Sequence, residues 1–284
     1  MAALIEVEDL HFRYHDGTPA LQGITLKIDQ GEKVAILGPN GAGKSTLLLH
    51  LNGIYHAQQG VVRVAGEKIT RANENWVRGK VGLVFQDPDD QVFSPTVWDD
   101  VAFGPLNQGL DRTTVEARVM EALRAVGMWD LRARAPHHLS YGQKKRVAIA
   151  GILAMNPEII ILDEPTAFLD PAGQRALFEI LEKLHARGKT IIIATHDVDL
   201  AAEWATSVIF LKEGKLLAQG DTSLLVEDSL VREADLRHPI VSQVFRQVPA
   251  LVIRPLPKTV AEGAHLIAQL VGEKERRRGF YIIS

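Results

Sequence analysis

The sequence predicts an α/β fold with a largely parallel central sheet, and two observations lead to this prediction. Short continuous apolar runs, typical of strands buried on both faces, occur at 34–37, 81–85, 159–162, 191–194 and 208–211. Segments with helical character lie between them, at 47–52, 115–126, 143–155 and 173–186. Because strands alternate with helices along the chain, we expect a parallel sheet covered by helices.

Three additions to this core are expected. Alternating segments that end at turn signals, at 4–14, 20–28 and 61–64, predict an N-terminal antiparallel β subdomain. The stretch between Phe85 and Ile159 contains no convincing strand, so we expect an inserted helical subdomain at about 87–155. The pattern weakens after Gly220. The predicted division is therefore a main domain at 1–221 and a small C-terminal extension at 222–284.

The composition narrows the possible classes of function. The chain has 284 residues, with 32 basic and 35 acidic side chains and a formal net charge of −3. Because a basic domain would be expected for nucleic-acid binding, no nucleic-acid partner is predicted. The chain contains no cysteine, which excludes disulfides, thiolate metal sites and a cysteine nucleophile. Its first residues lack a signal-peptide pattern, and no apolar run approaches the roughly 18 residues that span a bilayer.

A glycine-rich turn follows the apolar run at 34–37. From Gly38 to Ser45 the spacing is that of a P-loop, G-x-x-x-x-G-K-S. Glycines let backbone N–H groups approach phosphate oxygens, and the positive end of the next helix faces the same phosphates. We expect Lys44 to reach the β and γ phosphates and the Ser45 hydroxyl to ligate Mg²⁺. The predicted nucleotide-contacting residues are Gly38, Pro39, Asn40, Gly41, Ala42, Gly43, Lys44, Ser45 and Thr46.

Two later strands end in residues that suit phosphate hydrolysis. One ends in Asp163, which can hold Mg²⁺ opposite Ser45. Glu164 lies one residue further out, where its carboxylate could act as a general base toward the attacking water. Another strand leads to His196, which is placed to contact the γ-phosphate side and to hold the water and the glutamate.

The segment Ser140–Gln143 precedes a helix whose first turn carries basic side chains. Ser140 suits an N-cap, and Gly142 would let backbone N–H groups approach a phosphate. By itself this pattern indicates only a capped helix start.

Together these motifs resemble those of the ATP-binding cassette (ABC) family, over residues 5 to about 220. The resemblance implies a P-loop NTPase core in which Gly38–Thr46 is the Walker A motif. Ile159–Asp163 matches Walker B, with Glu164 as the catalytic carboxylate and His196 as the switch histidine. It also implies ATP as the nucleotide and Mg²⁺ as the cofactor.

The resemblance extends to four further motifs. Gln86 matches the Q-loop glutamine, which contacts magnesium and water and senses the membrane partner. Asp170 ends the D-loop, Ala167–Asp170. Tyr14 stands where the family stacks an aromatic ring on adenine, although a strand-face aromatic would look the same. The family signature, which faces the opposite ATP, is matched by Ser140, Tyr141, Gly142 and Gln143.

Two departures from the ABC pattern indicate a subfamily. Tyr141 replaces the first glycine of the usual LSGGQ signature, and Phe168 replaces a small D-loop residue. Neither change removes a phosphate ligand. The stretches 85–105 and 139–155 resemble the ATPases of energy-coupling-factor importers, with the greatest likeness to those of cobalt importers. Related ATPases serve nickel and vitamin importers, which remain the alternatives for the solute.

The resemblance also implies how the protein works. The signature of one cassette closes over ATP held on the P-loop of another, so a chain with one of each requires a dimer. A homodimer is the simpler expectation, because every catalytic residue is present. The implied partners are an integral membrane coupling subunit and a solute-binding membrane subunit. This places the chain peripherally at the cytoplasmic face of the cell membrane.

The segment from Gln86 to Phe103 is the expected contact with the membrane partner. Its apolar residues lie among acids and could receive a helix in a groove; alternatively, they could pack the core of their own subdomain. A stand-alone ABC ATPase without a membrane partner also remains an alternative. A chromosome-maintenance ATPase is excluded, because the chain has no long heptad-bearing insertion.

Overall fold

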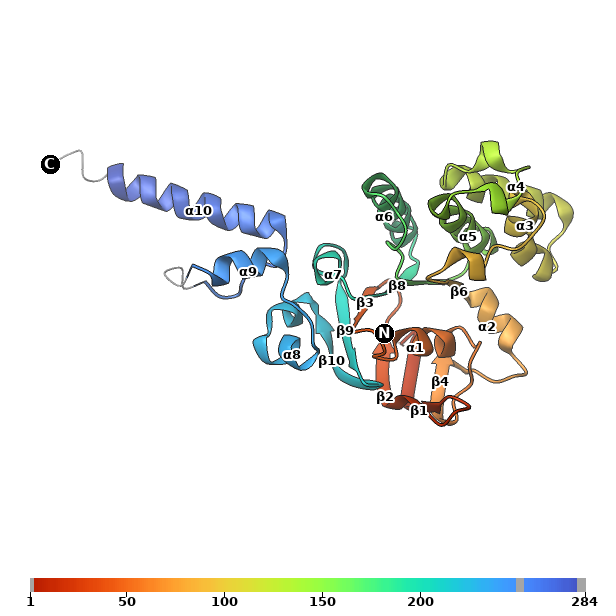
Figure 1. Cartoon of the computed structure of the whole chain (residues 1–284), viewed down its shortest axis with the longest axis horizontal. Helices are drawn as coiled ribbons and strands as arrows, with labels where there is room; N and C mark the ends of the chain where they lie inside the picture. The colour runs from red at the N-terminus through yellow and green to blue at the C-terminus, as the bar shows by residue number, and fades with distance from the viewer. Residues whose placement is uncertain (1–2, 249–252, 280–284) are drawn as a thin grey trace.

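The computed structural model describes residues 3–248 and 253–279, with side chains described up to Val271. Two sheets form the body of the molecule (Figure 1). The first is four-stranded, in the order β2-β1-β4-β5, and the second is six-stranded, in the order β10-β9-β3-β8-β7-β6. The strands are β1 (Ile5–Arg13), β2 (Pro19–Ile28), β3 (Lys33–Leu37), β4 (Gln59–Val64), β5 (Glu67–Lys68), β6 (Val81–Val84), β7 (Ile159–Asp163), β8 (Thr190–Thr195), β9 (Ser207–Lys212) and β10 (Lys215–Asp221).

The six-stranded sheet decides where the chemistry lies. Its strands β9, β3, β8, β7 and β6 run parallel, and only β10 is antiparallel to its neighbour. In the register, Leu37 pairs with Thr195, and Asp163 pairs with Ala194. The loops that follow β3, β7 and β8 therefore leave the sheet side by side at its carboxyl edge, where ligands of open α/β sheets bind.

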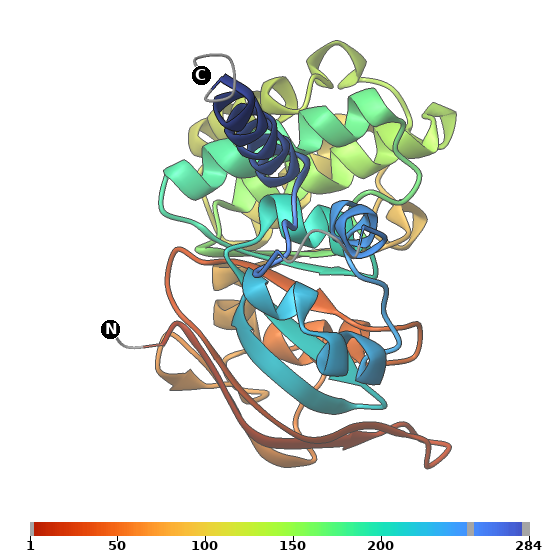
Figure 2. The ribbon, with the colours of Figure 1, turned by 90° about the vertical axis from the view of Figure 1, so that its left-hand side faces the viewer.

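Helices cover the sheets and form a separate cluster. They are α1 (Lys44–Leu51), α2 (Glu74–Lys80), α3 (Val97–Asn107), α4 (Arg112–Ala125), α5 (Tyr141–Met155), α6 (Pro171–Ala186), α7 (Val198–Trp204), α8 (Asp228–Glu233), α9 (Ile240–Arg246) and α10 (Val260–Gly279). Helices α3, α4 and α5 pack against one another around buried Val101, Val119 and Val147. Figure 2 shows this cluster in yellow and green on one side of the molecule and the antiparallel strands in red on the other.

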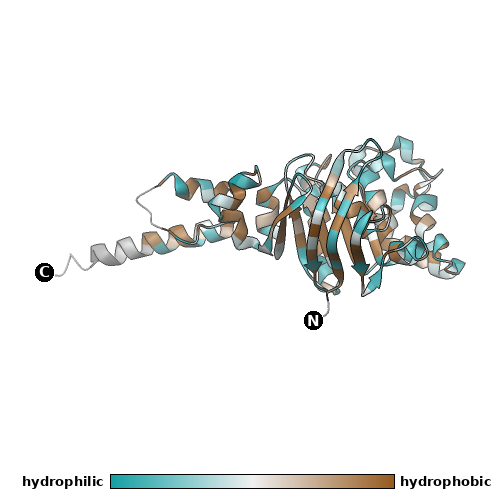
Figure 3. Ribbon diagram, turned by 90° about the horizontal axis from the view of Figure 1, so that it is seen from below, coloured by the Kyte–Doolittle hydropathy of each residue, from teal (hydrophilic) through white to brown (hydrophobic). Residues whose placement is uncertain are grey.

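The hydrophobic residues follow this layering. Strands β3, β7 and β8 are almost fully buried along their length, as expected for strands covered on both faces. Strand β1 instead shows only a partly buried pattern. In Figure 3 the strands in the middle of the molecule carry long brown segments, whereas the outer helices mix brown and teal.

The α/β fold with its antiparallel sheet and inserted helices agrees with the sequence prediction. No strand lies between β6 and β7 in the described chain, as expected. The pattern missed β10, whose apolar residues are only half-buried, and the two-residue β5. It also missed α3, which begins at Val97 and contains Pro105. The boundaries at 1–221, 87–155 and 222–284 remain predictions, and the last five residues lie outside the described ranges.

The C-terminal part begins with a short 3-10 helix, Thr222–Val226, followed by α8. Exposed apolar side chains spaced four residues apart form a row at Ile240 and Val244 of α9 and at Val248, just beyond the end of that helix. Helix α10 contacts α9 and then extends away from the body (Figure 1). In the described part of the chain, no helix is both long and apolar enough to cross a membrane.

Candidate nucleotide-binding site

The loop between β3 and α1 is shaped by two glycines. A Cβ atom on Gly38 would lie 2.2 Å from the carbonyl oxygen of Leu211, so no other residue fits there without moving the backbone. Gly43 has a φ of 98°, in the left-handed region, and a Cβ on it would lie 2.7 Å from the Ala20 carbonyl oxygen. The backbone N–H of Gly214 also donates to the Ala42 carbonyl oxygen, at 3.0 Å. The β9–β10 turn and β2 therefore hold the loop from outside.

The lysine of this loop makes hydrogen bonds to the backbone of the loop itself. The Lys44 ammonium donates hydrogen bonds to the carbonyl oxygens of Gly38 at 2.7 Å and Pro39 at 3.2 Å. Burial lowers the pKa of Lys44, and the nearby Glu164 and Asp163 carboxylates partly oppose this change. The ammonium thus lies at the centre of the loop, with two carboxylates close enough to influence it.

Asp163, the last residue of β7, is buried beside the start of α1. Burial raises its pKa, while a hydrogen bond from the Ser45 hydroxyl lowers it. One carboxylate, one hydroxyl and the nearby amide of Gln86 are hard oxygen donors of the kind that Mg²⁺ shares with substrate phosphates. The described residues contain no group of three or more His, Cys, Asp or Glu arranged to hold a metal. The donor set fits a magnesium ion that takes its remaining ligands from phosphates and water.

Glu164 is held by two side chains from the end of β8. Its Oε1 atom lies 2.9 Å from His196 Nδ1, and its Oε2 atom accepts a hydrogen bond from the Thr195 hydroxyl at 3.3 Å. Its backbone has a φ of 41°, which a non-glycine residue rarely adopts. The carboxylate is therefore fixed in one orientation at the exit of the strand. The sequence analysis did not name Thr195, although its place directly before His196 could have indicated it.

These residues line one cleft of about 520 Å³ at the carboxyl edge of the sheet. Of the predicted site residues, the cleft brings together Tyr14, Asn40, Gly41, Ala42, Gly43, Lys44, Ser45, Thr46, Gln86, Asp163, Glu164 and His196. Gly38 and Pro39 lie behind it and contribute the carbonyl groups that hold Lys44. Thr18, Pro19 and Ala20, from β2 and its preceding turn, also line the cleft, although no sequence pattern indicated them. Ala167, the first residue of the expected D-loop, lines it as well.

Tyr14 reaches the cleft from the turn after β1. Its hydroxyl makes a 2.6 Å hydrogen bond with the Thr46 hydroxyl, and its ring packs edge-on against Phe12 at 5.6 Å. The ring is partly exposed at the cleft wall. An apolar face at this position can stack on a base, and the contact of Tyr14 with adenine stays a prediction.

The signature residues lie away from this cleft. Ser140 caps α5, accepting a hydrogen bond from the Gln143 backbone N–H at 3.3 Å, while the Gln143 side chain accepts one from the Ser140 N–H at 2.9 Å. Tyr141 and Gly142 occupy the first turn of the same helix. Asp170 caps α6 by accepting a hydrogen bond from the Gly173 N–H at 2.6 Å. None of these five residues lines the cleft that holds the P-loop.

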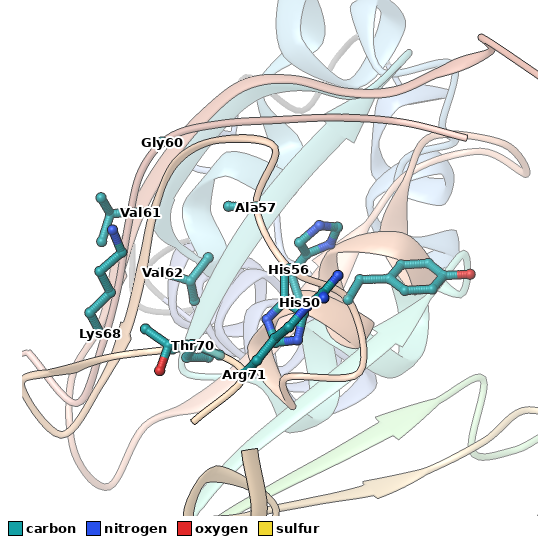
Figure 4. Close-up of a pocket in the computed structure, with 11 residues that line it drawn as sticks. His50, His56, Ala57, Gly60, Val61, Val62, Lys68, Thr70 and Arg71 are labelled. Atoms are coloured by element: carbon teal, nitrogen blue, oxygen red, sulfur yellow. The ribbon is translucent and has the colours of Figure 1, made fainter. Parts of the chain in front are cut away.

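A second pocket, of about 180 Å³, lies beside β4 and contains none of the predicted site residues (Figure 4). His50 of α1 is among the residues that line this pocket. Its Nδ1 atom donates to the Thr46 carbonyl oxygen at 2.7 Å, so in the neutral ring the proton resides on Nδ1. The ring is fully buried, and this burial lowers the pKa of His50. His50 is thus a neutral core residue that supports the first helix.

Comparison with known proteins agrees with this geometry. The family model described as ABC transporter matches residues 21–167, which include the P-loop, the Gln86 segment and the strand that ends in Asp163. The chain belongs to the ABC transporter family. It is an ATPase of that family, and its curated relatives place it among the energy-coupling factor ATP-binding proteins.

Two such relatives cover most of the chain. The energy-coupling factor transporter ATP-binding protein EcfA of Carboxydothermus hydrogenoformans is 49% identical over 95% of this chain and 100% of its own length. The EcfA protein of Methanocaldococcus jannaschii is 54% identical over 85% of this chain and 88% of its own.

Solved structures of ABC cassettes share the fold. CbiO1 from Clostridium perfringens, described as part of the ABC transporter complex CbiONQ, has a TM-score of 0.72 at 41% identity and covers 87% of this chain and 100% of its own. A dimeric post-hydrolysis state of an ATP-binding cassette, bound to ADP and Pi, has a TM-score of 0.71 at 29% identity and covers 77% of this chain and 98% of its own.

Proposed function

We propose that this ATPase powers the uptake of a metal ion, cobalt, through an energy-coupling-factor membrane importer. The ATP-hydrolysing role rests on the cleft in which Lys44, Asp163 and Glu164 meet His196 at one sheet edge. The importer role is supported by the likeness to EcfA and CbiO1. Lys44 binds the β and γ phosphates, because its ammonium already lies among the carbonyls of the loop. Glu164, fixed by Thr195 and His196, orients water and accepts its proton.

Ser45, Gln86 and Asp163 are the residues proposed to hold Mg²⁺. When bound, the ion neutralises charge that develops on the phosphates. His196 keeps its exposed edge toward the γ-phosphate side while its Nδ1 atom holds Glu164. Tyr14 offers its ring to the adenine. These roles divide the cleft into a base end, a phosphate loop and a hydrolytic end.

We further propose that two copies of this chain complete the site. Ser140–Gln143 and Asp170 lie outside the cleft of their own chain, although they carry the family motif expected to face a nucleotide. The ABC structures similar to this chain include dimeric cassettes. The signature of one copy would then cover the nucleotide on the P-loop of the other. The exposed row on and just after α9, made of Ile240, Val244 and Val248, offers a further contact between copies.

A mixing experiment tests the shared site. Lys44→Ala damages the P-loop, and Ser140→Arg places a bulky charge on the signature, so each variant alone should be inactive. In a mixed dimer, one site would combine the intact P-loop of the second variant with the intact signature of the first. Mixing should therefore restore about a quarter of the wild-type turnover if the two sites act independently. Mixed dimers that form, as judged by differential tags, and remain inactive would contradict the shared site.

The surface proposed for the membrane partner lies next to the Q-loop. Val92, Val97 and Val101 are buried in the helical cluster, so part of the segment 86–103 packs its own subdomain. Phe93 and Phe103 are 68% and 50% exposed, with ring centroids 5.2 Å apart, and both line a groove of about 310 Å³. Exposed aromatic side chains in a groove suit an amphipathic helix from an integral membrane coupling subunit.

Co-purification tests the partner and the solute together. A tag on this chain should recover, from solubilised membranes, an integral coupling subunit and a solute-binding membrane subunit. Metal analysis of that complex should find cobalt. Nickel or a vitamin in its place would keep the ATPase role and contradict the solute, whereas recovery without any membrane subunit would favour a stand-alone ATPase. Location at the cytoplasmic face of the membrane follows from the same assembly.

A further inference from the structure

Lys145 is a buried cation without a carboxylate partner in the described hydrogen-bond network. Its side chain is 0% exposed, and its ammonium donates to two main-chain carbonyl oxygens, those of Phe85 at 2.7 Å and Gln86 at 2.9 Å. Burial lowers the pKa of Lys145 to about 8. A buried charge is costly unless it is hydrogen-bonded, so a hydrophobic residue would be the ordinary occupant of this position. What Lys145 adds is a connection between α5 and the segment that contains Gln86.

Two more side chains from the first turns of α5 contact the same segment. The Tyr141 hydroxyl donates to Asp87 Oδ2 at 3.3 Å, and the Lys144 ammonium lies 2.5 Å from Asp89 Oδ1. The Lys144 ammonium also lies 5.6 Å from the centre of the Tyr141 ring. Positions 141, 144 and 145 are spaced by three and four residues and therefore share one face of the helix. That face of the helix contacts the segment 85–89 at both of its ends, Phe85 and Asp89, and at its middle residue, Asp87.

We propose that Tyr141, Lys144 and Lys145 form a clamp that positions Gln86 relative to the signature Ser140–Gln143. The clamp joins two parts of the machinery. Gln86 lies in the cleft of this chain, whereas the signature at the start of α5 faces outward. With the segment 85–89 held to α5 at successive points, a shift of either part carries the other with it. This proposal rests on the role assigned to Gln86 in the proposed function.

The clamp gives a physical reason for an unusual residue in the signature. A glycine at position 141 would have no side chain to reach Asp87, and the helix would hold the segment only through the two lysines. The Tyr141 ring also contacts the ring of Phe168, with centroids 4.8 Å apart. Tyr141 therefore touches both the Q-loop side and the D-loop side of its own chain. The two sequence departures, at positions 141 and 168, are in contact with each other.

A positioning role and a purely structural role differ in what they change. Lys145 does not line the nucleotide cleft, so replacing it should leave nucleotide affinity without Mg²⁺ nearly unchanged. If it positions Gln86, a proposed Mg²⁺ ligand, its loss should reduce kcat and the gain in affinity that Mg²⁺ provides. Misplacement of a catalytic group by about 1 Å can reduce turnover by about a hundredfold. A structural role would instead lower stability and leave the parameters of the folded fraction unchanged.

The test uses the full-length chain and four variants: Lys145→Met, Tyr141→Phe, Asp87→Asn and the double variant Tyr141→Phe/Asp87→Asn. Lys145→Met should lower kcat by about tenfold to a hundredfold, with ATP affinity in EDTA within about twofold of wild type. Tyr141→Phe removes the bond, and Asp87→Asn removes the charge of its acceptor. Both changes act on one bond, so the double variant should be no slower than the slower single variant. Lys183→Met, a change at an exposed lysine on α6, is the matched control.

Two outcomes would overturn the clamp. One is a folded Lys145→Met protein with wild-type kcat and wild-type Mg²⁺ dependence. The other is a pair of independent, additive losses in the Tyr141→Phe and Asp87→Asn cycle, which also decides the matter if Lys145→Met fails to fold. Failure of the proposed function looks different, because the wild-type chain itself would then show no Mg²⁺-dependent ATP hydrolysis.

Discussion

The Nδ1 atom of His196 lies 2.9 Å from Oε1 of Glu164, and the two residues differ sharply in exposure. The histidine side chain is 66% exposed, whereas the glutamate side chain is 11% exposed. The contact therefore joins a carboxylate at the base of the cleft to a ring that reaches its open side. A ligand that touches His196 can in this way influence the orientation of the proposed general base.

Replacing Glu164 with Gln should abolish turnover while nucleotide remains bound. The amide keeps the size of the side chain and a hydrogen bond to His196 or Thr195 but cannot accept a proton from water. General-base catalysis contributes about 10²–10⁴-fold to the rate, so kcat should decrease by a factor in that range. Phosphate release and ATP retention on gel filtration measure the two effects. Glu179→Gln, on the exposed face of α6, is the control, and a Glu164→Gln enzyme of near wild-type rate would remove Glu164 from the base role.

Replacing Lys44 with Ala should weaken nucleotide binding itself. The ammonium is the cation at the centre of the loop, and hydrogen bonds to charged groups contribute about 1.5–3 kcal/mol each. We therefore expect a loss of affinity of at least about tenfold, measured by fluorescence titration with a labelled ATP analogue. The exposed Lys183→Ala on α6 should bind as wild type does. Unchanged affinity in Lys44→Ala would contradict its assignment.

Acid should destabilise the fold through His50. Burial lowers the pKa of its ring below the ordinary value of 6.5, so the unfolded chain binds a proton more readily than the folded chain. The stabilising contribution of the neutral ring is complete above that ordinary value and is lost as pH falls through the lower, folded-state pKa. Between about pH 7.5 and about pH 5.5, His50→Gln should therefore lose less free energy of unfolding than wild type. Urea unfolding at the two pH values gives the comparison, and equal losses would exclude His50 as a source of acid sensitivity.

Replacing Phe103 with Ser should reduce capture of the membrane subunit without lowering basal ATP hydrolysis. The ring is half exposed on the groove next to Phe93, so its removal costs little internal packing. Truncating a central aromatic contact typically costs about 2 kcal/mol or more in binding, which is roughly thirtyfold in affinity. Co-purification of the membrane subunit measures this loss. Full capture by Phe103→Ser would move the docking surface elsewhere.

Replacing Val244 with Asp should weaken self-association if α9 contributes to the contact between copies. The side chain is exposed between Ile240 and Val248, so the change should not disturb the fold of a single chain. Burying a carboxylate in an apolar contact is unfavourable, and the dimer should dissociate at higher protein concentration than wild type. Analytical ultracentrifugation in the presence of ATP measures this association, with Val244→Asp introduced into the Glu164→Gln variant so that ATP is not hydrolysed. Identical association would assign the exposed row of α9 to another role.

Local sequence patterns predicted most of the residues of the candidate nucleotide site. Gly38, Lys44, Asp163 and His196 lie at or just after the ends of strands whose apolar runs are clear in the sequence, and parallel strands bring their carboxyl ends to one edge. The pairing of the β9–β10 turn with the P-loop could not be predicted, since Gly214 lies far from Ala42 in sequence and carries no distinctive pattern. Lys145 was also invisible as a buried residue, because a lysine in a basic helical turn ordinarily reaches solvent.

The contact between Gly38 and Leu211 has a consequence for how the protein is made. The glycine-rich loop of the candidate site is synthesised early, but the backbone that packs behind it, at Leu211 and Gly214, emerges from the ribosome some 170 residues later. A growing chain that lacks this late hairpin has the complete sequence motif without its completed binding loop. Nascent chains should therefore ignore the abundant cellular nucleotide until the whole cassette has been translated. Binding of ATP would then indicate that the last strands of the central sheet have paired.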